Sequence, residues 1–216
     1  MFHIRIILLL TTFITIPAPL IAQTNGSAWQ LAKEQQGIKV YTRTIAGSKF
    51  KEFKGEVEIS SSIDSLLSFI NNAEYCPQWR YKCMQMMSLS EGYIYKLSNL
   101  PWPLSDRYTV MSSQLLINAA QNIYTLQLKN IKREQLPQHI LAQLPAAGST
   151  VQMHSSDGYW QFKLSSPTSI HITYQMHGDP AGVLPAALAN QGVTNAAFVT
   201  LLNLKKHFSA TGRRGF

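Results

Sequence analysis

One arginine stands where it could hold the polar end of a small molecule. Trp102 lies between two prolines, and Arg107 follows shortly after and opens a run of strand-like residues. Because proline fixes its own φ angle and restricts the preceding residue, we expect this segment to be extended or turned. If Arg107 shares a strand face with Met111, its guanidinium points to the covered side of a sheet, where it needs a partner. The alternatives are a salt bridge to Asp106 or another carboxylate, or exposure at the strand end.

The chain has two cysteines, Cys76 and Cys83. Two cysteines without a further Cys or His pair at finger spacing do not make a zinc site. An oxidising compartment would permit a disulfide between them, and Pro77 favours the bend that such a loop needs. Whether they are paired stays open, because the required distance cannot be read from the sequence.

The sequence contains no recognisable catalytic motif. It lacks a Gly-x-Ser-x-Gly elbow, a His-Glu-x-x-His pair, a phosphate loop and a dinucleotide fingerprint. His171 and His177 fall on one face of a predicted strand, and we expect that face to meet solvent rather than to bind a metal. No Asp, Glu or His stands out as a buried general acid or base. We therefore predict a protein that is not an enzyme, with no catalytic residue, metal or cofactor.

The composition favours a chain that buries or encloses apolar material. Apolar residues make up 45% of the 216 residues and charged residues 14%, whereas about a quarter is usual for charged residues. No interior stretch reads as a linker, so we expect one domain. The net charge is +8, but the basic residues are scattered. This pattern argues against nucleic acid as a partner and is compatible with weak, transient contact with an anionic membrane surface.

The N-terminal residues have the order of a secretory signal peptide. Arg5 precedes the uncharged apolar residues 6–16, and residues 17–22 form a breaker segment that ends in a small residue. The apolar run is shorter than the roughly 20 residues that a membrane span needs. We predict a cleaved signal peptide over residues 1–22, a ligand-binding domain over residues 23–216, and a periplasmic or secreted protein. An uncleaved anchor is the alternative.

Hydrophobic periodicity and capping residues predict the elements that position these side chains. Strands that follow one another, with helices set apart, indicate an α+β fold with an antiparallel sheet. The inner face of a curved sheet needs a cover, and the last helix is the obvious one. We predict helices over residues 28–36, 63–71, 139–143 and 185–207, and strands over residues 38–43, 53–59, 93–97, 108–117, 122–128, 160–164 and 170–176.

The last predicted helix combines an apolar stripe with many small residues. The stripe has helical spacing and includes Val193, Leu201 and Phe208. Because protein interiors pack densely, the small residues predict a cavity, unless the sheet approaches closely and fills that space with its own aromatic side chains. The small residues are Ala186, Ala187, Ala189, Gly192 and Ala196.

A series of short motifs runs through most of the chain in one order. They are Trp29, GIKVYTR at residues 37–43, FKG at residues 53–55, Trp79, PWPLSDR at residues 101–107, GYW at residues 158–160, Tyr174 and DPAGVLP at residues 179–185. Together they resemble the START domain, a lipid-transfer domain related to the steroidogenic acute regulatory protein. The resemblance covers about residues 29–208, and its specific part is the combination of the segments 101–107 and 179–185.

This resemblance implies a helix-grip fold. In it, a curved antiparallel sheet wraps around a long C-terminal helix, and a tunnel between them holds a sterol, a phospholipid or another lipid. It also implies that Arg107 faces the tunnel and pairs with an acidic residue or with a polar group of the ligand. An acidic partner is not evident here, since the preceding strand offers Tyr93 and Tyr95.

We therefore expect a monomer that binds, and transfers, a lipid or other hydrophobic ligand in an internal apolar cavity. Two alternatives stay open: a cyclase-like or hydrolytic enzyme that uses the same cavity, as some helix-grip relatives do, and a ligand-dependent interaction module. The predicted ligand-binding residues are Arg107 as the polar anchor, with Trp102, Tyr95, Tyr174, Trp160, Met111, Phe198 and Leu202.

Overall fold

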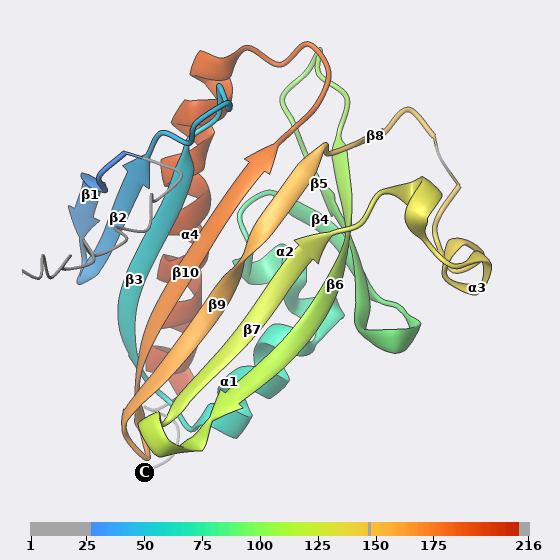
Figure 1. The fold of residues 1–216 in the computed structure, drawn as a ribbon. Helices are drawn as coiled ribbons and strands as arrows, with labels where there is room; N and C mark the ends of the chain where they lie inside the picture. Colours follow the sequence, from blue (N-terminus) through green and yellow to red (C-terminus); the bar gives the residue numbers. More distant parts are fainter. Residues whose placement is uncertain (1–26, 147, 212–216) are drawn as a thin grey trace, which may run out of the picture.

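The computed structural model describes residues 27–146 and 148–211 (Figure 1). The predicted signal peptide over residues 1–22 lies outside them. No helix in the described part of the chain is long and apolar enough to cross a membrane.

The described strands form one ten-stranded sheet in the order β1-β2-β3-β10-β9-β7-β6-β5-β4, with β8 paired to β6. Neighbouring strands are antiparallel except for β8, which runs parallel to β6. The strands are β1 (Gln30–Gln35), β2 (Ile38–Arg43), β3 (Glu52–Ser60), β4 (Cys83–Ser88), β5 (Tyr93–Ser98), β6 (Arg107–Asn118), β7 (Ile123–Asn130), β8 (Val151–Gln152), β9 (Ser155–Ser166) and β10 (Ser169–Asp179).

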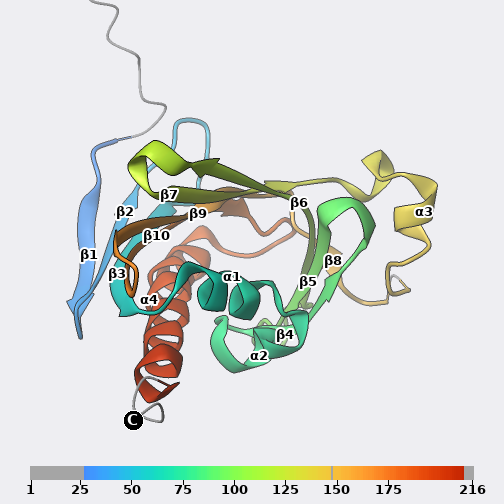
Figure 2. The ribbon, with the colours of Figure 1, turned by 90° about the horizontal axis from the view of Figure 1, so that it is seen from below.

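The helices gather on the concave side of this sheet or at its ends. Seen from below, the sheet curves around α4, and α1 and α2 lie on the same side of it (Figure 2). The helices are α1 (Ile63–Asn71), α2 (Cys76–Trp79), α3 (Gln138–Leu141) and α4 (Ala186–Thr211), with short 3-10 turns η1 (Ala73–Tyr75), η2 (Ser90–Gly92), η3 (Ala119–Gln121) and η4 (Arg133–Gln135). This arrangement is the predicted α+β helix-grip fold.

The C-terminal half of α4 packs tightly against the sheet. Ala197, Leu201 and Leu204 are fully buried. Gly55 of β3 makes this contact possible, because a Cβ atom there would lie 2.6 Å from Cδ1 of Leu201. The predicted apolar stripe is therefore confirmed, and the contact fixes α4 along β3.

Local sequence explains where α1 begins and why β3 holds its register. Ser62 caps α1, since its side chain accepts a hydrogen bond from the backbone N–H of Ser65. Along β3, the buried residues Phe53, Val57 and Ile59 alternate with less buried ones. Both elements agree with the periodicity of the sequence.

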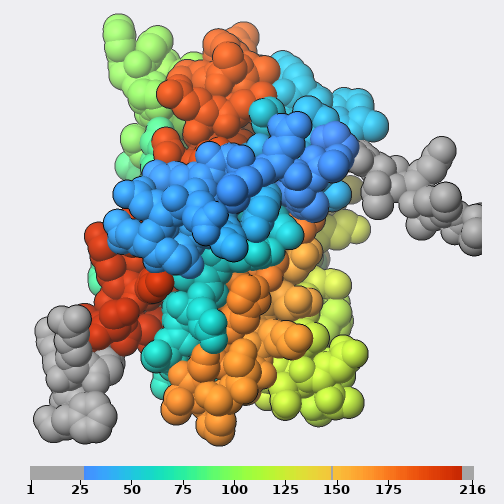
Figure 3. All heavy atoms as spheres, turned by 90° about the vertical axis from the view of Figure 1, so that its left-hand side faces the viewer, coloured from blue at the N-terminus to red at the C-terminus, as the bar shows by residue number. Residues whose placement is uncertain are grey.

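The predicted helix over residues 28–36 is wrong, because Gln30–Gln35 form strand β1. Gln36 and Gly37 both have positive φ angles, 55° and 70°, as in a two-residue turn between hairpin strands. Pairing with β2 outweighs the helix propensity of these residues, which is worth only tenths of a kcal/mol each. Figure 3 shows the edge strand β1 and its neighbour β2 as a blue band on the surface.

Candidate functional site

A cavity of about 330 Å³ lies beside the N-terminal half of α4. The helix residues that line it include Ala189, Gly192 and Ala196. A Cβ atom added to Gly192 would meet nothing within 4 Å, so this position opens into free space. The predicted link between small residues and a cavity is confirmed: one half of α4 fills the core, and the other half leaves room.

Arg107 lies at this cavity, but its hydrogen bonds go to the protein itself. It is 5% exposed, and its guanidinium donates to the backbone carbonyls of Ser105, Pro180 and Ala181. These bonds tie the loop between β10 and α4 to the beginning of β6. The hydrogen-bond partners of Arg107 are thus backbone carbonyl oxygens and not the carboxylate that the sequence analysis looked for.

Backbone geometry keeps that loop close to Arg107. Ala181 and Gly182 have positive φ angles of 58° and 67°, and a Cβ atom on Gly182 would lie 3.3 Å from Nη2 of Arg107. The backbone N–H of Ala181 also donates to Oδ1 of Asp179 at 2.8 Å. The DPAG segment therefore forms a tight turn whose carbonyls face the arginine.

Arg107 and Tyr174 are the two predicted ligand-binding residues that line this cavity, and their contact with a ligand stays a prediction. The structure places the others elsewhere. Trp102 is 92% exposed, and Met111, Trp160 and Phe198 are buried in the main core, with Leu202 packed against it.

Tyr95 is misplaced because we assigned the wrong face of its strand to the cavity. It packs with Tyr108 in a second apolar cluster that includes Ile140 of α3. The opposite face of β5 carries Lys96 and Ser98, and these two side chains line the cavity.

Lys96 is the functional candidate that sequence reasoning missed. Burial, and then the neighbouring charge of Arg80, lower its pKa from 10.5 to about 8. Burial also lowers the pKa of Arg80, whose guanidinium carbon lies 4.6 Å from the ring centre of Trp79. On β6, Arg107 and Thr109 are two residues apart and share a face. Their cross-strand partners on β5 are Ser98 and Lys96, so a register that places Arg107 on the inner face of the sheet also places Lys96 there. This pairing of β5 with β6 is the feature from which Lys96 could have been predicted to line the cavity.

The described residues that line the cavity are basic, polar or apolar, and none is an Asp or Glu. The basic ones include Lys51, Lys82 and Lys96. His177 also lines the cavity, although we expected its face to meet solvent, and its Nε2 lies 3.1 Å from Oγ of Ser48. Within the described residues, no cluster of three or more His, Cys, Asp or Glu side chains could hold a metal ion. The site can therefore attract anions, and it presents no carboxylate for acid–base chemistry.

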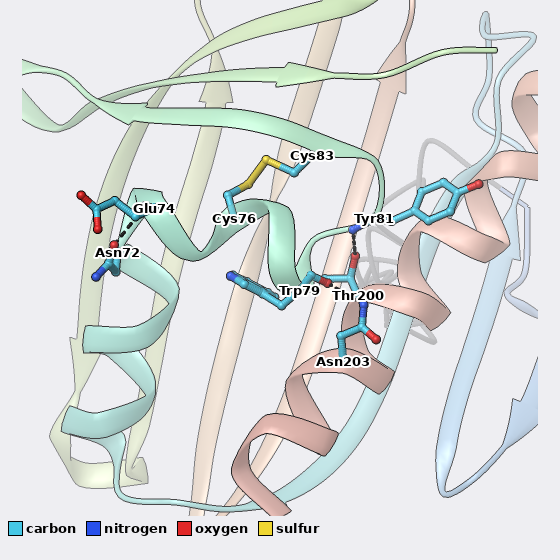
Figure 4. The surroundings of a disulfide bond; sticks show 8 residues. All are labelled: Asn72, Glu74, Cys76, Trp79, Tyr81, Cys83, Thr200 and Asn203. Carbon is cyan, nitrogen blue, oxygen red and sulfur yellow. Dashed lines mark hydrogen bonds between the residues drawn. A yellow bond between two sulfur atoms is a disulfide. The ribbon is translucent and has the colours of Figure 1, made fainter. Parts of the chain in front are cut away.

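A disulfide closes the loop that brings Tyr81 and Lys82 to the cavity. Cys76 and Cys83 are bonded, with their sulfur atoms 2.02 Å apart, and the loop between them carries Arg80, Tyr81 and Lys82. Two hydrogen bonds fasten it to α4 (Figure 4). Oγ1 of Thr200 accepts from the backbone N–H of Tyr81 at 3.0 Å, and the Asn203 side chain donates to the carbonyl of Trp79 at 3.3 Å.

Comparison with known proteins agrees with this fold. No family model matches the chain. An uncharacterised protein of Pseudomonas aeruginosa is 25% identical over 181 residues, which cover 82% of this chain and 85% of that protein.

Solved structures give the class. The STAR-related lipid transfer protein of Xanthomonas axonopodis is 28% identical, with a TM-score of 0.71 over 85% of this chain and 99% of that one. Human StAR-related lipid transfer protein 5 is 13% identical, with a TM-score of 0.69 over 85% and 88%. The protein is thus a helix-grip protein whose single sheet curves around α4 and leaves a cavity beside that helix. More specifically, its fold is that of the START domains, as the sequence motifs predicted.

Proposed function

We propose that this protein binds a lipid or another hydrophobic molecule in the cavity beside α4 and carries it without changing it. The observation that supports this most is the contrast within α4, whose small residues leave about 330 Å³ open while its other half is fully packed. This volume is at the lower end of the roughly 300–1,000 Å³ of small-molecule sites. The name of the Xanthomonas relative, a lipid transfer protein, supports the same function.

In this proposal the loop between β10 and α4 moves when the ligand enters. Pro180 and Leu184 of this loop line the cavity, and Arg107 holds the loop through backbone carbonyls. Loops and lids of this kind open on microsecond to millisecond timescales in many proteins. Arg107 is therefore a latch in this proposal.

Transfer would take place at a membrane surface. Trp102 and Val183 are 92% and 91% exposed, and each neighbours a residue that lines the cavity, Pro101 and Leu184. Exposed tryptophan is typical of membrane interfaces, and the net charge of +8 favours anionic lipid. The disulfide suits the periplasmic or secreted location that the N-terminal residues suggest. We propose that the carrier acts as a monomer.

The direct test is to identify what the purified protein carries. Organic extraction and mass spectrometry of the wild-type protein should recover a hydrophobic molecule. A Gly192→Phe variant, whose ring would occupy the open space, should yield much less when purified in parallel. If wild-type protein from several expression hosts carries nothing, and binds no member of a lipid panel, the carrier function is wrong.

One observation favours an enzyme as the second candidate. The pKa of Lys96, about 8, is low enough for the amine to act as a base or a nucleophile near neutral pH. Turnover of an aromatic or thioester substrate that is lost in Lys96→Met, while the substrate still binds, would support this function over the carrier.

A further inference from the structure

Buried hydrogen-bond donors without partners gather next to the cavity. In the described part of the chain, Nε1 of Trp79, Nε of Arg80, Oγ1 of Thr109 and Nε1 of Trp160 are buried and form no hydrogen bond. The one other such atom is Oδ1 of Asn130, an acceptor at the end of β7. Buried polar atoms nearly always have partners. A group of four donors without acceptors therefore indicates a missing acceptor.

Contacts connect these donors to the wall of the cavity. The guanidinium carbon of Arg80 lies 5.8 Å from the ring centre of Trp160. Trp160 stacks on Tyr174 at 3.7 Å between ring centres, and Tyr174 lines the cavity. Thr109 is the cross-strand partner of Lys96, so both side chains stand on the same face of the sheet. The unbonded donors thus lie beside two residues of the cavity wall.

Two cations in this region lack a counter-charge. Arg80 and Lys96 are close enough for their charges to interact, and neither forms an ion pair with a described carboxylate. Lys82 adds a further positive charge, and it lines the cavity together with Lys96. Burying like charges together without an anion is unfavourable. An anion bound between Arg80 and Lys96 would offset the repulsion between the two positive charges.

Aromatic stacking accounts for only part of this arrangement. Contact with Trp79 and Trp160 compensates part of the desolvation of Arg80, but it leaves Nε unbonded and does nothing for Lys96. Arg107, at the same cavity, shows what a satisfied buried arginine looks like, since backbone carbonyls accept its hydrogen bonds. Backbone carbonyls therefore satisfy Arg107, whereas Nε of Arg80 has no acceptor among the described residues.

We propose that the ligand is an anionic amphiphile whose carboxylate or phosphate group binds at Lys96 and Arg80, while its apolar part lies along Ala189 and Gly192 of α4. This inference rests on the proposed function, because it assumes that the cavity holds the ligand. The cavity volume of about 330 Å³ favours a molecule with one apolar chain or ring system over a phospholipid with two chains.

The test compares ligands that differ only in the head group. A long-chain fatty acid, the alcohol and the lysophosphatidic acid of the same chain length, and inorganic phosphate alone are titrated into the wild-type protein by calorimetry. We expect at least one of the two anionic lipids to bind tenfold or more tightly than the alcohol, and phosphate alone to bind weakly. Which anionic lipid is preferred separates carboxylate from phosphate recognition.

Variants then assign the head group to Lys96. Lys96→Met should lose most of the acid-to-alcohol preference and keep its affinity for the alcohol, whereas Lys96→Arg should retain the preference. Lys129→Met, which removes the same charge from an exposed position on β7, is the matched control and should behave like wild type. Circular dichroism checks that each variant is folded.

The outcomes separate this inference from the proposed function. Equal affinity of wild-type protein for acid and alcohol overturns the anionic head group and leaves the carrier intact, and this measurement needs no variant. Tight binding of inorganic phosphate without any lipid overturns the amphiphile in favour of a small-anion site. Failure of every lipid to bind removes the proposed function itself.

Discussion

Gly192 offers the sharpest perturbation, because its replacement should stabilise the protein and, with a large side chain, abolish ligand binding. It lies within α4, faces open space and lines the cavity. Glycine inside a helix costs about 1 kcal/mol relative to alanine, and phenylalanine about half of that. We therefore expect Gly192→Ala to gain about 1 kcal/mol and Gly192→Phe about 0.5 kcal/mol, or about 2–4 °C and 1–2 °C in Tm.

The two variants should differ sharply in binding. A ligand present at about a hundred times its Kd stabilises the native state by about 2.7 kcal/mol, which raises Tm by about 5–10 °C in a chain of this size. Wild type and Gly192→Ala should show this shift in a thermal melt with added fatty acid. Gly192→Phe should show little or none, because its ring occupies the space that the ligand needs.

Two results would refute this reasoning. A full ligand-induced shift in Gly192→Phe would mean that the ligand binds elsewhere. A loss of more than about 1 kcal/mol in the free energy of unfolding of Gly192→Phe would mean that the position is packed rather than open, since overpacking a filled core costs about 1–3 kcal/mol.

Three further outcomes follow from the contacts at the cavity. Arg107→Met should speed up exchange of a bound fluorescent lipid in stopped-flow measurements and change its equilibrium affinity much less, because the guanidinium latches the loop; an unchanged exchange rate would contradict the latch. Reducing the Cys76–Cys83 disulfide should lower the free energy of unfolding in urea by about 2.5 kcal/mol, the entropy of closing so short a loop, and thiol titration before reduction should find no free thiol. Burial lowers the pKa of Lys96 from 10.5 to about 8, so between these pH values the unfolded chain binds the proton more strongly, and the free energy of unfolding should rise with pH by roughly 3 kcal/mol relative to Lys96→Met. Arg80 is the charge that acts on Lys96, and Lys51, Tyr81, Lys82, Arg107, Tyr174 and His177 line the same cavity. Binding of an anionic lipid should weaken above pH 8. A wild-type difference from Lys96→Met that stays constant across this window would contradict the buried charge.

The sequence was informative wherever only one face of an element is covered. Helix α1 has the predicted bounds, and β3 and the C-terminal half of α4 show the predicted alternation of buried residues, because each turns one side to the core. Strand β1 is exposed on both faces and therefore carries no alternation. Its pairing with β2 is a long-range property that helix propensity alone cannot reveal.

The lining of the cavity was harder to predict for the opposite reason. Both faces of β5 are covered, one by the cavity and the other by the cluster around Tyr95 and Ile140. When both faces of a strand are covered, apolar residues occur on both, so their pattern does not show which face lines the cavity. The prediction placed Tyr95 on the cavity side of β5, whereas the residue that lies on that side is Lys96. Trp102 was predicted to line the cavity but is exposed. The prolines on either side of it restrict the backbone and do not determine whether the side chain points inward or outward.

Arg107 and Arg80 show why a residue type alone does not define a binding site. Arg107 belongs to the motif that carries the family resemblance, yet backbone carbonyls accept its hydrogen bonds, so a ligand would have to displace those bonds to reach it. Arg80 belongs to no recognised motif here, but its Nε has no acceptor and its charge faces that of Lys96 rather than a carboxylate. A ligand anion gains more by binding an unsatisfied donor than by competing for a satisfied one. The head group should therefore bind near the disulfide loop, and the tight turn around Arg107 should control how fast the ligand enters and leaves.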